Sequence, residues 1–231
     1  MAGRAALARQ GYADARGYFT NLINDVRCPT NLLPAAYYAL GDTYLEQDPE
    51  PGATNTLDRF AKAIPVFDAI RKNYPSSSLV PLALGKIANC HLQLGLEDPA
   101  RYLAAATNYL EVMSLPAADV ATRSQAEIGL AIVREKQGEQ LKTAAEKSVL
   151  LKEALEHCLT VFYQRNLRPG EEADSFWRSQ SGLEAARLAE SFQLWSQAAN
   201  LYQSLMDSYP PLQTTLTNKL ARARARAAAI R

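Results

Sequence analysis

The segment AIPVFDAIRKNYP, residues 63–75, contains the pattern that decides the fold. Ala63, Phe67 and Ile70 are separated by four and then three residues, which places them on one face of a helix. The same order of a small, a large and an aliphatic residue occurs at four other places: Ala15/Phe19/Leu22, Ala105/Tyr109/Val112, Ala154/Cys158/Val161 and Ala198/Tyr202/Leu205. The small residues lie 48, 42, 49 and 44 positions apart. A helical pattern that repeats at this period predicts a stacked array of helix pairs.

The rest of the chain is also predicted to be helical. The sequence contains about eleven helical segments and no segment whose apolar and polar residues alternate as in a half-buried strand. Residues 48–56 read as a polar loop. Gly138 is expected to end a helix over residues 117–137, and a long helix is expected over 139–164. We therefore predict an all-α fold in a single domain over residues 1–231. Its helix pairs span roughly residues 2–27, 32–75, 79–116, 117–166 and 175–210, and a capping helix covers 214–230.

Two of these pairs carry a more specific pattern. One complete unit, with an insertion over residues 48–57, is marked by Tyr37, Leu40, Gly41, Tyr44, Ala63, Phe67 and Pro75. The second half of another unit is marked by Trp195, Ala198, Tyr202, Leu205 and Pro210. These residues resemble the tetratricopeptide repeat (TPR), whose pattern is W-x2-L-G-x2-Y, A-x3-F and P. The resemblance implies a right-handed α-α superhelix of about five helix pairs. Because a glycine inside a helix costs about 1 kcal/mol relative to alanine, we expect two helices to approach closely at Gly41.

The ends of two repeats resemble a particular subset of this family. The tails Tyr74-Pro75-Ser76-Ser77-Ser78 and Tyr209-Pro210 are similar to those in bacterial envelope proteins, such as the outer-membrane β-barrel assembly lipoproteins and the Tol–Pal coordinator family. The resemblance implies the periplasmic side of a bacterial cell envelope rather than the cytoplasm. The first residues contain no long apolar segment of the signal-peptide kind. Because they lead directly into the first repeat, we expect the chain to be part of a longer protein, with any targeting signal outside it.

Composition excludes some partners. The chain has 25 Lys and Arg against 24 Asp and Glu, and a net charge near zero argues against a general polyanion binder. No run of about 18 apolar residues predicts a membrane-spanning helix. The C-terminal segment is locally basic, with Lys219, Arg222, Arg224, Arg226 and Arg231. A patch for nucleic acid or anionic lipid is one interpretation of this segment, and a solvated capping helix is the interpretation we prefer. We expect no specific nucleic-acid partner.

The sequence offers little for catalysis or metal binding. Cys28, Cys90 and Cys158 are widely spaced and form no Cys-x-x-Cys pair, and Cys158 takes the large-residue position of a repeat, where we expect it to be buried. His91 and His157 are the two histidines, and each falls at a helical repeat position. The sequence contains no nucleophile elbow, phosphate loop or His-Glu-x-x-His motif. We therefore predict no enzyme activity, no cofactor and no metal, although an enzyme that uses one of the two histidines remains a possible alternative.

The family resemblance identifies candidate binding residues, because in TPR proteins the first helix of each pair lines a concave groove. The implied groove residues are Tyr38, Asp42, Leu45, Glu46, Asn89, Leu92, Gln93, Arg187 and Glu190. Of these, Asn89 fits the Lys/Asn/Arg clamp by which some family members hold a C-terminal carboxylate. A solvated polar face is the alternative interpretation of each. We expect Tyr37 to pack between helices and Tyr38, about 100° around the helix, to face the groove.

Two functions remain open besides the enzyme. The first is a non-catalytic scaffold that binds a protein or peptide in its groove. The second is a structural spacer in a larger bacterial cell-envelope assembly. The sequence gives neither the partner nor the oligomeric state.

Overall fold

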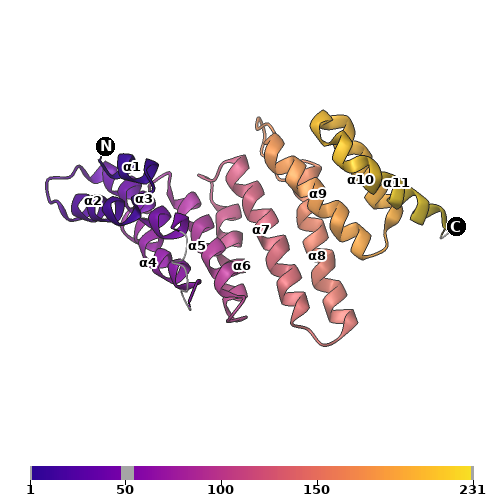
Figure 1. Cartoon of the computed structure of the whole chain (residues 1–231), viewed down its shortest axis with the longest axis horizontal. Coiled ribbons are helices and arrows are strands. Elements are labelled where there is room, and N and C mark those ends of the chain that lie inside the picture. Colours follow the sequence, from indigo (N-terminus) through magenta and orange to yellow (C-terminus); the bar gives the residue numbers. More distant parts are fainter. Residues whose placement is uncertain (1, 48–54, 230–231) are drawn as a thin grey trace. The chain divides into compact units, whose positions relative to one another are not determined.

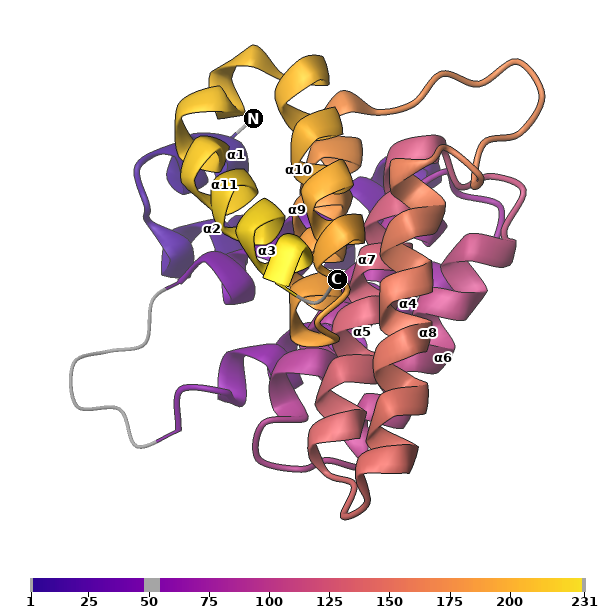
Figure 2. The same ribbon diagram turned by 90° about the vertical axis from the view of Figure 1, so that its right-hand side faces the viewer.

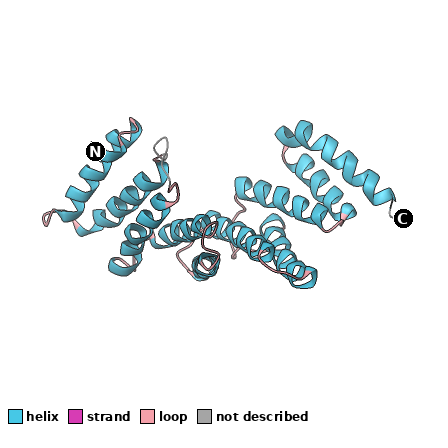
Figure 3. Cartoon of the chain, turned by 60° about the horizontal axis from the view of Figure 1, so that its bottom comes forward, coloured by secondary structure: helices cyan, strands magenta, loops and turns pink. Residues whose placement is uncertain are grey.

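The computed structural model describes residues 2–47 and 55–229, and within them it contains eleven α-helices and no strand (Figures 1 and 3). This confirms the predicted all-α class. Most of the predicted polar loop over 48–56, and of the repeat insertion over 48–57, lies outside the described residues. The chain divides into two compact units, Met1–Ala118 and Asp119–Arg231, which are described separately. That all helices belong to one domain remains a prediction.

Each unit is built from helices that pack on their neighbours in sequence. Unit 1 contains α1 (Ala2–Ala8), α2 (Tyr12–Asn24), α3 (Leu33–Glu46), α4 (Asp58–Asn73), α5 (Val80–Leu94) and α6 (Arg101–Ser114). Unit 2 contains α7 (Val120–Glu139), α8 (Ala144–Phe162), α9 (Ser175–Ser191), α10 (Trp195–Ser208) and α11 (Gln213–Ala229). Short 3-10 helices, Thr30–Leu32 and Pro210–Leu212, precede α3 and α11. Within each unit every helix packs on the next, as in a helical repeat solenoid.

The repeated pattern forms the core, as the sequence predicts. Fourteen of its fifteen residues are buried, including Phe67, Tyr109 and Tyr202 with Cys158 in the equivalent position. The exception is Leu22 of α2, which is 38% exposed. Small residues sit at the helix crossings and large ones fill the space between helices, so each pair needs its neighbour to bury its apolar face.

Gly41 illustrates how closely the helices approach. A Cβ atom built on Gly41 of α3 would lie 2.5 Å from Cζ of Phe67 in α4, well inside van der Waals contact. Gly182 of α9 is enclosed in the same way, by Phe162 of α8 and Leu205 of α10. The close approach expected at Gly41 is therefore confirmed, and the physical reason is an aromatic ring packed on the glycine.

We predict that Gly41→Ala lowers the free energy of unfolding by about 1–3 kcal/mol, since the Phe67 ring must move to accommodate the methyl group. The matched control is Gly85→Ala in α5, where an added Cβ meets nothing within 4 Å. This control should raise stability by about 0.5–1 kcal/mol, because alanine is the better helix former. Chemical denaturation of both variants tests the difference, and equal effects would contradict the packing described for α3 and α4.

Helix ends follow two recurrent designs. Tyr74 and Tyr209, each followed by proline, end α4 and α10 with similar backbone angles, and their N–H groups donate to Ile70 O and Leu205 O at 2.9 and 2.8 Å. Three other ends place a glutamine in the left-handed region: Gln10, Gln164 and Gln193, with φ of 60°, 61° and 57°. After each, an N–H group bonds to the carbonyl five residues earlier, which is the Schellman arrangement that usually employs glycine.

We predict that Gln193→Gly stabilises unit 2 by about 1 kcal/mol, because glycine adopts the left-handed conformation without the Cβ clash of glutamine. Gln193 is exposed, so little side-chain packing is lost. Gln197→Gly, four residues later inside α10, is the control and should cost about 1 kcal/mol. Thermal melts of the two variants should therefore shift in opposite directions; a lower melting temperature for Gln193→Gly would contradict this explanation.

The α7–α8 boundary differs from the prediction. Gly138 does not interrupt a helix; it is buried in the last turn of α7, and the following helix begins at Ala144 rather than at 139. The reason is a local cap: the Thr143 hydroxyl accepts from the N–H of Glu146 at 3.3 Å and donates to its carboxylate at 2.6 Å. An N-cap of this kind fixes where a helix starts more strongly than a single glycine stops one.

The long connection between α8 and α9 is anchored on α7 (Figure 2). Arg123 is 4% exposed, and its guanidinium group pairs with Glu171 and donates to Asn166 O at 3.2 Å. Asn166 also donates to the Ser124 hydroxyl at 2.8 Å. The hydrogen bonds from Arg123 and from the Arg168 N–H lower the pKa of Glu171. This carboxylate therefore favours the folded state above its ordinary pKa, and the contribution is lost as the pH falls through the lowered value.

Candidate functional site

Ion pairs connect the first helices of successive pairs, one in unit 1 and two in unit 2. Each pair joins an acid of the earlier helix to a base of the later one: Asp42–Lys86 from α3 to α5 at 2.8 Å, Glu135–Arg187 from α7 to α9 at 2.7 Å, and Glu190–Arg222 from α9 to α11 at 2.7 Å. We call the faces that carry these pairs the first-helix surfaces of unit 1 and unit 2. The three pairs include three of the predicted groove residues, Asp42, Arg187 and Glu190.

On unit 1 the ion pair is joined by an aromatic ring. The Lys86 ammonium group lies 5.7 Å from the centre of the Tyr38 ring, within the range of a cation–π contact. Burial alone would lower the pKa of Lys86, but the hydrogen bond and charge of Asp42, with Tyr38 and Glu46, raise it overall. Lys86 is therefore held as a cation next to a partly exposed ring and the exposed Glu46.

The other predicted groove residues of unit 1 differ in accessibility. Asn89 is half-buried, and its side-chain oxygen accepts from the Tyr109 hydroxyl at 2.5 Å. Leu92 is buried at 9% exposure, so its side chain packs inside and is not part of the first-helix surface. Leu45 and Gln93 are half-buried. The carbonyl of Leu45 accepts from Arg59 of α4 at 3.3 Å, which satisfies part of the α3 C-terminus.

Tyr37 and Tyr38 do not differ in burial as predicted. Tyr37 is half-buried rather than enclosed, with its ring 6.1 Å from that of Tyr74. Tyr38 is also half-buried, and its ring packs edge-on against Phe67 at 5.4 Å. The expected difference in burial between Tyr37 and Tyr38 is therefore wrong. The Phe67 ring, which packs on Gly41, also covers one side of the Tyr38 ring.

We predict that Tyr38→Ala lowers the free energy of unfolding by about 1–3 kcal/mol, since the variant loses an aromatic pair and half-buried area. Phe67→Ala should cost more, about 3–5 kcal/mol. Tyr18→Ala on α2, where the ring is 49% exposed, provides the low reference. Urea denaturation should rank the three in that order. If Tyr38→Ala lowered the free energy of unfolding as little as Tyr18→Ala, Tyr38 would be an exposed groove residue, as the sequence predicted.

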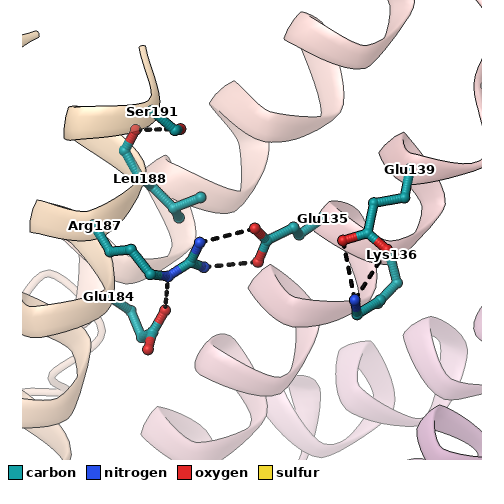
Figure 4. A network of polar contacts seen from close by, with 7 residues as sticks. All are labelled: Glu135, Lys136, Glu139, Glu184, Arg187, Leu188 and Ser191. Carbon is teal, nitrogen blue, oxygen red and sulfur yellow. Dashed lines mark hydrogen bonds and ion pairs between the residues drawn. The ribbon is translucent and has the colours of Figure 1, made fainter. Parts of the chain in front are cut away.

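On unit 2 the network centres on Arg187 (Figure 4). Its guanidinium group binds both carboxylate oxygens of Glu135 at 2.9 and 2.7 Å, and its Nε donates to Glu184 at 2.8 Å. These carboxylates raise the pKa of Arg187. One turn further along α9, Glu190 accepts from Arg222 and, at 3.3 Å, from the Tyr202 hydroxyl. Burial, followed by the charge of Glu190, raises the pKa of Tyr202 to about 12.

An open pocket of about 400 Å³ lies beside this network. Glu135 and Glu139 of α7 form one wall, and Lys147 and Leu151 of α8 with Phe192 at the end of α9 complete it. The mixture of charged groups with an apolar side chain and a ring suits a peptide side chain better than a polar small molecule.

The two histidines weighed for catalysis differ in their contacts: the buried Nδ1 of His91 has no hydrogen-bond partner among the described residues, whereas His157 contacts α7. Among the described residues, no three His, Cys, Asp or Glu side chains are grouped so that they could hold a metal ion. His157 Nδ1 lies 2.6 Å from Glu127 of α7. Cys158 is buried as predicted, and burial raises the pKa of the Cys90 and Cys158 thiols to about 12. A thiol with such a pKa is a poor nucleophile at neutral pH.

Sequence reasoning missed Lys86, Glu135 and the role of Arg222. It placed Arg222 only in a basic tail, whereas in the structure three arginines of α11 contact the rest of unit 2: Arg222 with Glu190, Arg224 with Gln203, and Arg226 over the Trp195 ring. No local spacing signals these contacts, because each joins residues at least 21 positions apart. Among the described helices, none has the length and hydropathy needed to span a membrane.

Comparison with known proteins supports the repeat assignment in one region. A search of curated proteins found no match. Residues 35–77, which cover most of α3, all of α4 and the Gly41–Phe67 contact, match the family model of the tetratricopeptide repeat. TPR repeats generally mediate protein–protein interaction. The match over these residues, together with the helical repeat architecture of the described chain, supports a TPR protein.

Proposed function

We propose that this protein is a non-catalytic scaffold that binds a peptide segment of another protein along its first-helix surfaces. The observation that carries the proposal is the cluster of Tyr38, Asp42 and Lys86 on α3 and α5. It lies within and next to the segment that matches the TPR model.

The chemistry of this cluster suits a peptide. A partly exposed tyrosine ring offers a binding anchor with little conformational freedom to lose. Lys86, held as a cation, can bind a carboxylate or a backbone carbonyl. Glu46, exposed at the end of α3, offers the opposite charge. These features favour a partner segment with an acidic and a basic side chain rather than one that is uniformly charged.

The alternative function is a spacer within a bacterial envelope assembly. It is favoured by the Tyr-Pro ends of α4 and α10, whose backbone geometry is shared and whose sequence is similar to that of envelope repeats. A spacer needs no selective surface on α3 and α5. Binding at the Lys86 cluster therefore distinguishes the two functions.

We predict that peptides selected against the intact chain from a random display library bind the Lys86 cluster. Lys86→Gln should lower the affinity for the selected peptides by about tenfold, since a charge-assisted hydrogen bond is worth about 1.5–3 kcal/mol. The matched control is Lys62→Gln, which removes an exposed lysine paired with Asp58 on α4. Fluorescence anisotropy compares the affinities. Peptides that are equally sensitive to both variants, or a selection that returns none, would count against the scaffold.

A further inference from the structure

The pocket of about 400 Å³ beside the Arg187 network has an apolar floor that continues the core of unit 2. Leu151 of α8 and Phe192 at the end of α9 line this pocket. Both side chains are half-buried, and both pack against the buried core of unit 2. An apolar side chain that entered the pocket would therefore extend an existing core and leave water, which is favourable.

The end of α9 fixes the place of the Phe192 ring. The backbone N–H of Phe192 donates to Leu188 O at 3.2 Å, and after the left-handed Gln193 the N–H of Leu194 donates to Ala189 O at 2.9 Å. These hydrogen bonds hold the backbone on both sides of the ring. Binding at the ring therefore does not first have to order this part of the chain.

Two of the three charged side chains that line the pocket are already neutralised within unit 2 (Figure 4). Both carboxylate oxygens of Glu135 accept from Arg187, and both carboxylate oxygens of Glu139 accept from the Lys136 ammonium group. The third charged side chain is Lys147, which forms no ion pair with any described residue. The charge left uncompensated in the lining is therefore positive, which favours a carboxylate on the ligand.

Lys147 is held in place by packing on α7. A Cβ atom built on Gly138 would lie 3.7 Å from Cγ of Lys147, so the aliphatic stem of the lysine lies against the last turn of α7. The neighbouring Ser148 is half-buried and also lines the pocket, where its hydroxyl can donate to a carboxylate. A lysine whose stem is packed loses less conformational freedom on binding than a lysine that moves freely.

We propose that this pocket binds a segment of the partner peptide in which a large apolar residue is adjacent to an acidic one. The apolar side chain packs on Leu151 and Phe192. The side-chain carboxylate next to it pairs with Lys147 and accepts from the Ser148 hydroxyl. This inference rests on the proposed peptide-binding function and specifies which residues of the peptide unit 2 recognises.

Three synthetic hexapeptides test the proposal. They are identical except at the two central positions, which are Phe-Glu, Phe-Lys or Ala-Glu between glycine and serine residues. Acetyl and amide caps remove the terminal charges, so that a glutamate side chain is the only carboxylate in these peptides. Each peptide is titrated into the isotope-labelled intact chain, and binding is followed by the shifts of the backbone amide signals in NMR spectra.

The Phe-Glu peptide should shift the amide signals of Ser148, Leu151 and Phe192. The Phe-Lys and Ala-Glu peptides should bind at least about tenfold more weakly, because one loses the charge-assisted hydrogen bond and the other the buried ring. Equal binding of the Phe-Lys peptide would mean that the pocket prefers no acid, and would overturn the proposal. So would a Phe-Glu peptide that does not bind, or that shifts only signals outside the pocket.

Two pairs of matched variants locate the site. Ala144→Trp fills the pocket that Ala144 lines, whereas Ala145→Trp places the same bulk on an exposed neighbour outside the lining. Lys147→Gln removes the uncompensated charge, and Lys142→Gln removes an exposed lysine that does not line the pocket. Ala144→Trp and Lys147→Gln should each lower the affinity for the Phe-Glu peptide by about tenfold, and their controls should leave it unchanged. Circular dichroism checks that all four variants remain folded, and equal effects within either pair overturn the site.

The result is separable from that of the scaffold proposed above, because the hexapeptides do not come from the display selection. Lys86→Gln on unit 1 should leave the affinity for the Phe-Glu peptide unchanged. If selected peptides bind through Lys86 but the Phe-Glu peptide does not bind, the inference about the pocket fails and the α3–α5 surface stands. If the Phe-Glu peptide binds through Lys147 but no selected peptide depends on Lys86, the pocket stands and the α3–α5 surface fails.

Discussion

The contact between Gly41 and Phe67 is the constraint on which the rest of unit 1 depends. With no Cβ on α3 at that position, the ring from α4 packs directly against the helix backbone, which sets how close the two helices lie. The ring in turn supports Tyr38, and Tyr38 lies next to Lys86 of α5. A single glycine thus determines the spacing of α3 and α4 and the exposure of the ring that we consider the best binding anchor on this unit.

Unit 2 uses the same principle with different residues. Gly182 receives Phe162 and Leu205 from the helices on either side of α9, and buried Cys158 occupies a position that is aromatic in the four other repeats. The smaller cysteine side chain lies in α8, and the connection from α8 to α9 is held by the buried Arg123 of α7. Packing density, rather than residue identity, is what the repeats share.

Polar side chains on the first-helix surfaces already have a role in the fold. Asp42, Arg187 and Glu190 pair with the neighbouring first helix, which helps to align successive pairs within a unit. Pairs of this kind at a partly exposed surface contribute little stability, about 0–1 kcal/mol. They can therefore be exchanged for contacts with a partner at small cost, which is why a surface already satisfied by internal ion pairs is still compatible with binding.

The sequence alone determined the helical array. The spacing of Ala63, Phe67 and Ile70, repeated four times, predicts which face of each second helix is buried, because that face follows from a helical period of 3.6 residues. It also predicted the close approach at Gly41. Local capping was only partly predictable: the left-handed Gln10, Gln164 and Gln193 lack the glycine that normally signals such a turn.

Only the tertiary structure decided the candidate sites. Lys86 joins Asp42 from 44 positions away in sequence, and Arg222 joins Glu190 across 32, so no local pattern records either pair. Leu92 and Tyr38 were assigned to the groove from the family resemblance, but their exposure depends on which neighbouring helix covers them. Helical periodicity specifies directions around one axis, whereas a binding surface depends on the distances between several axes.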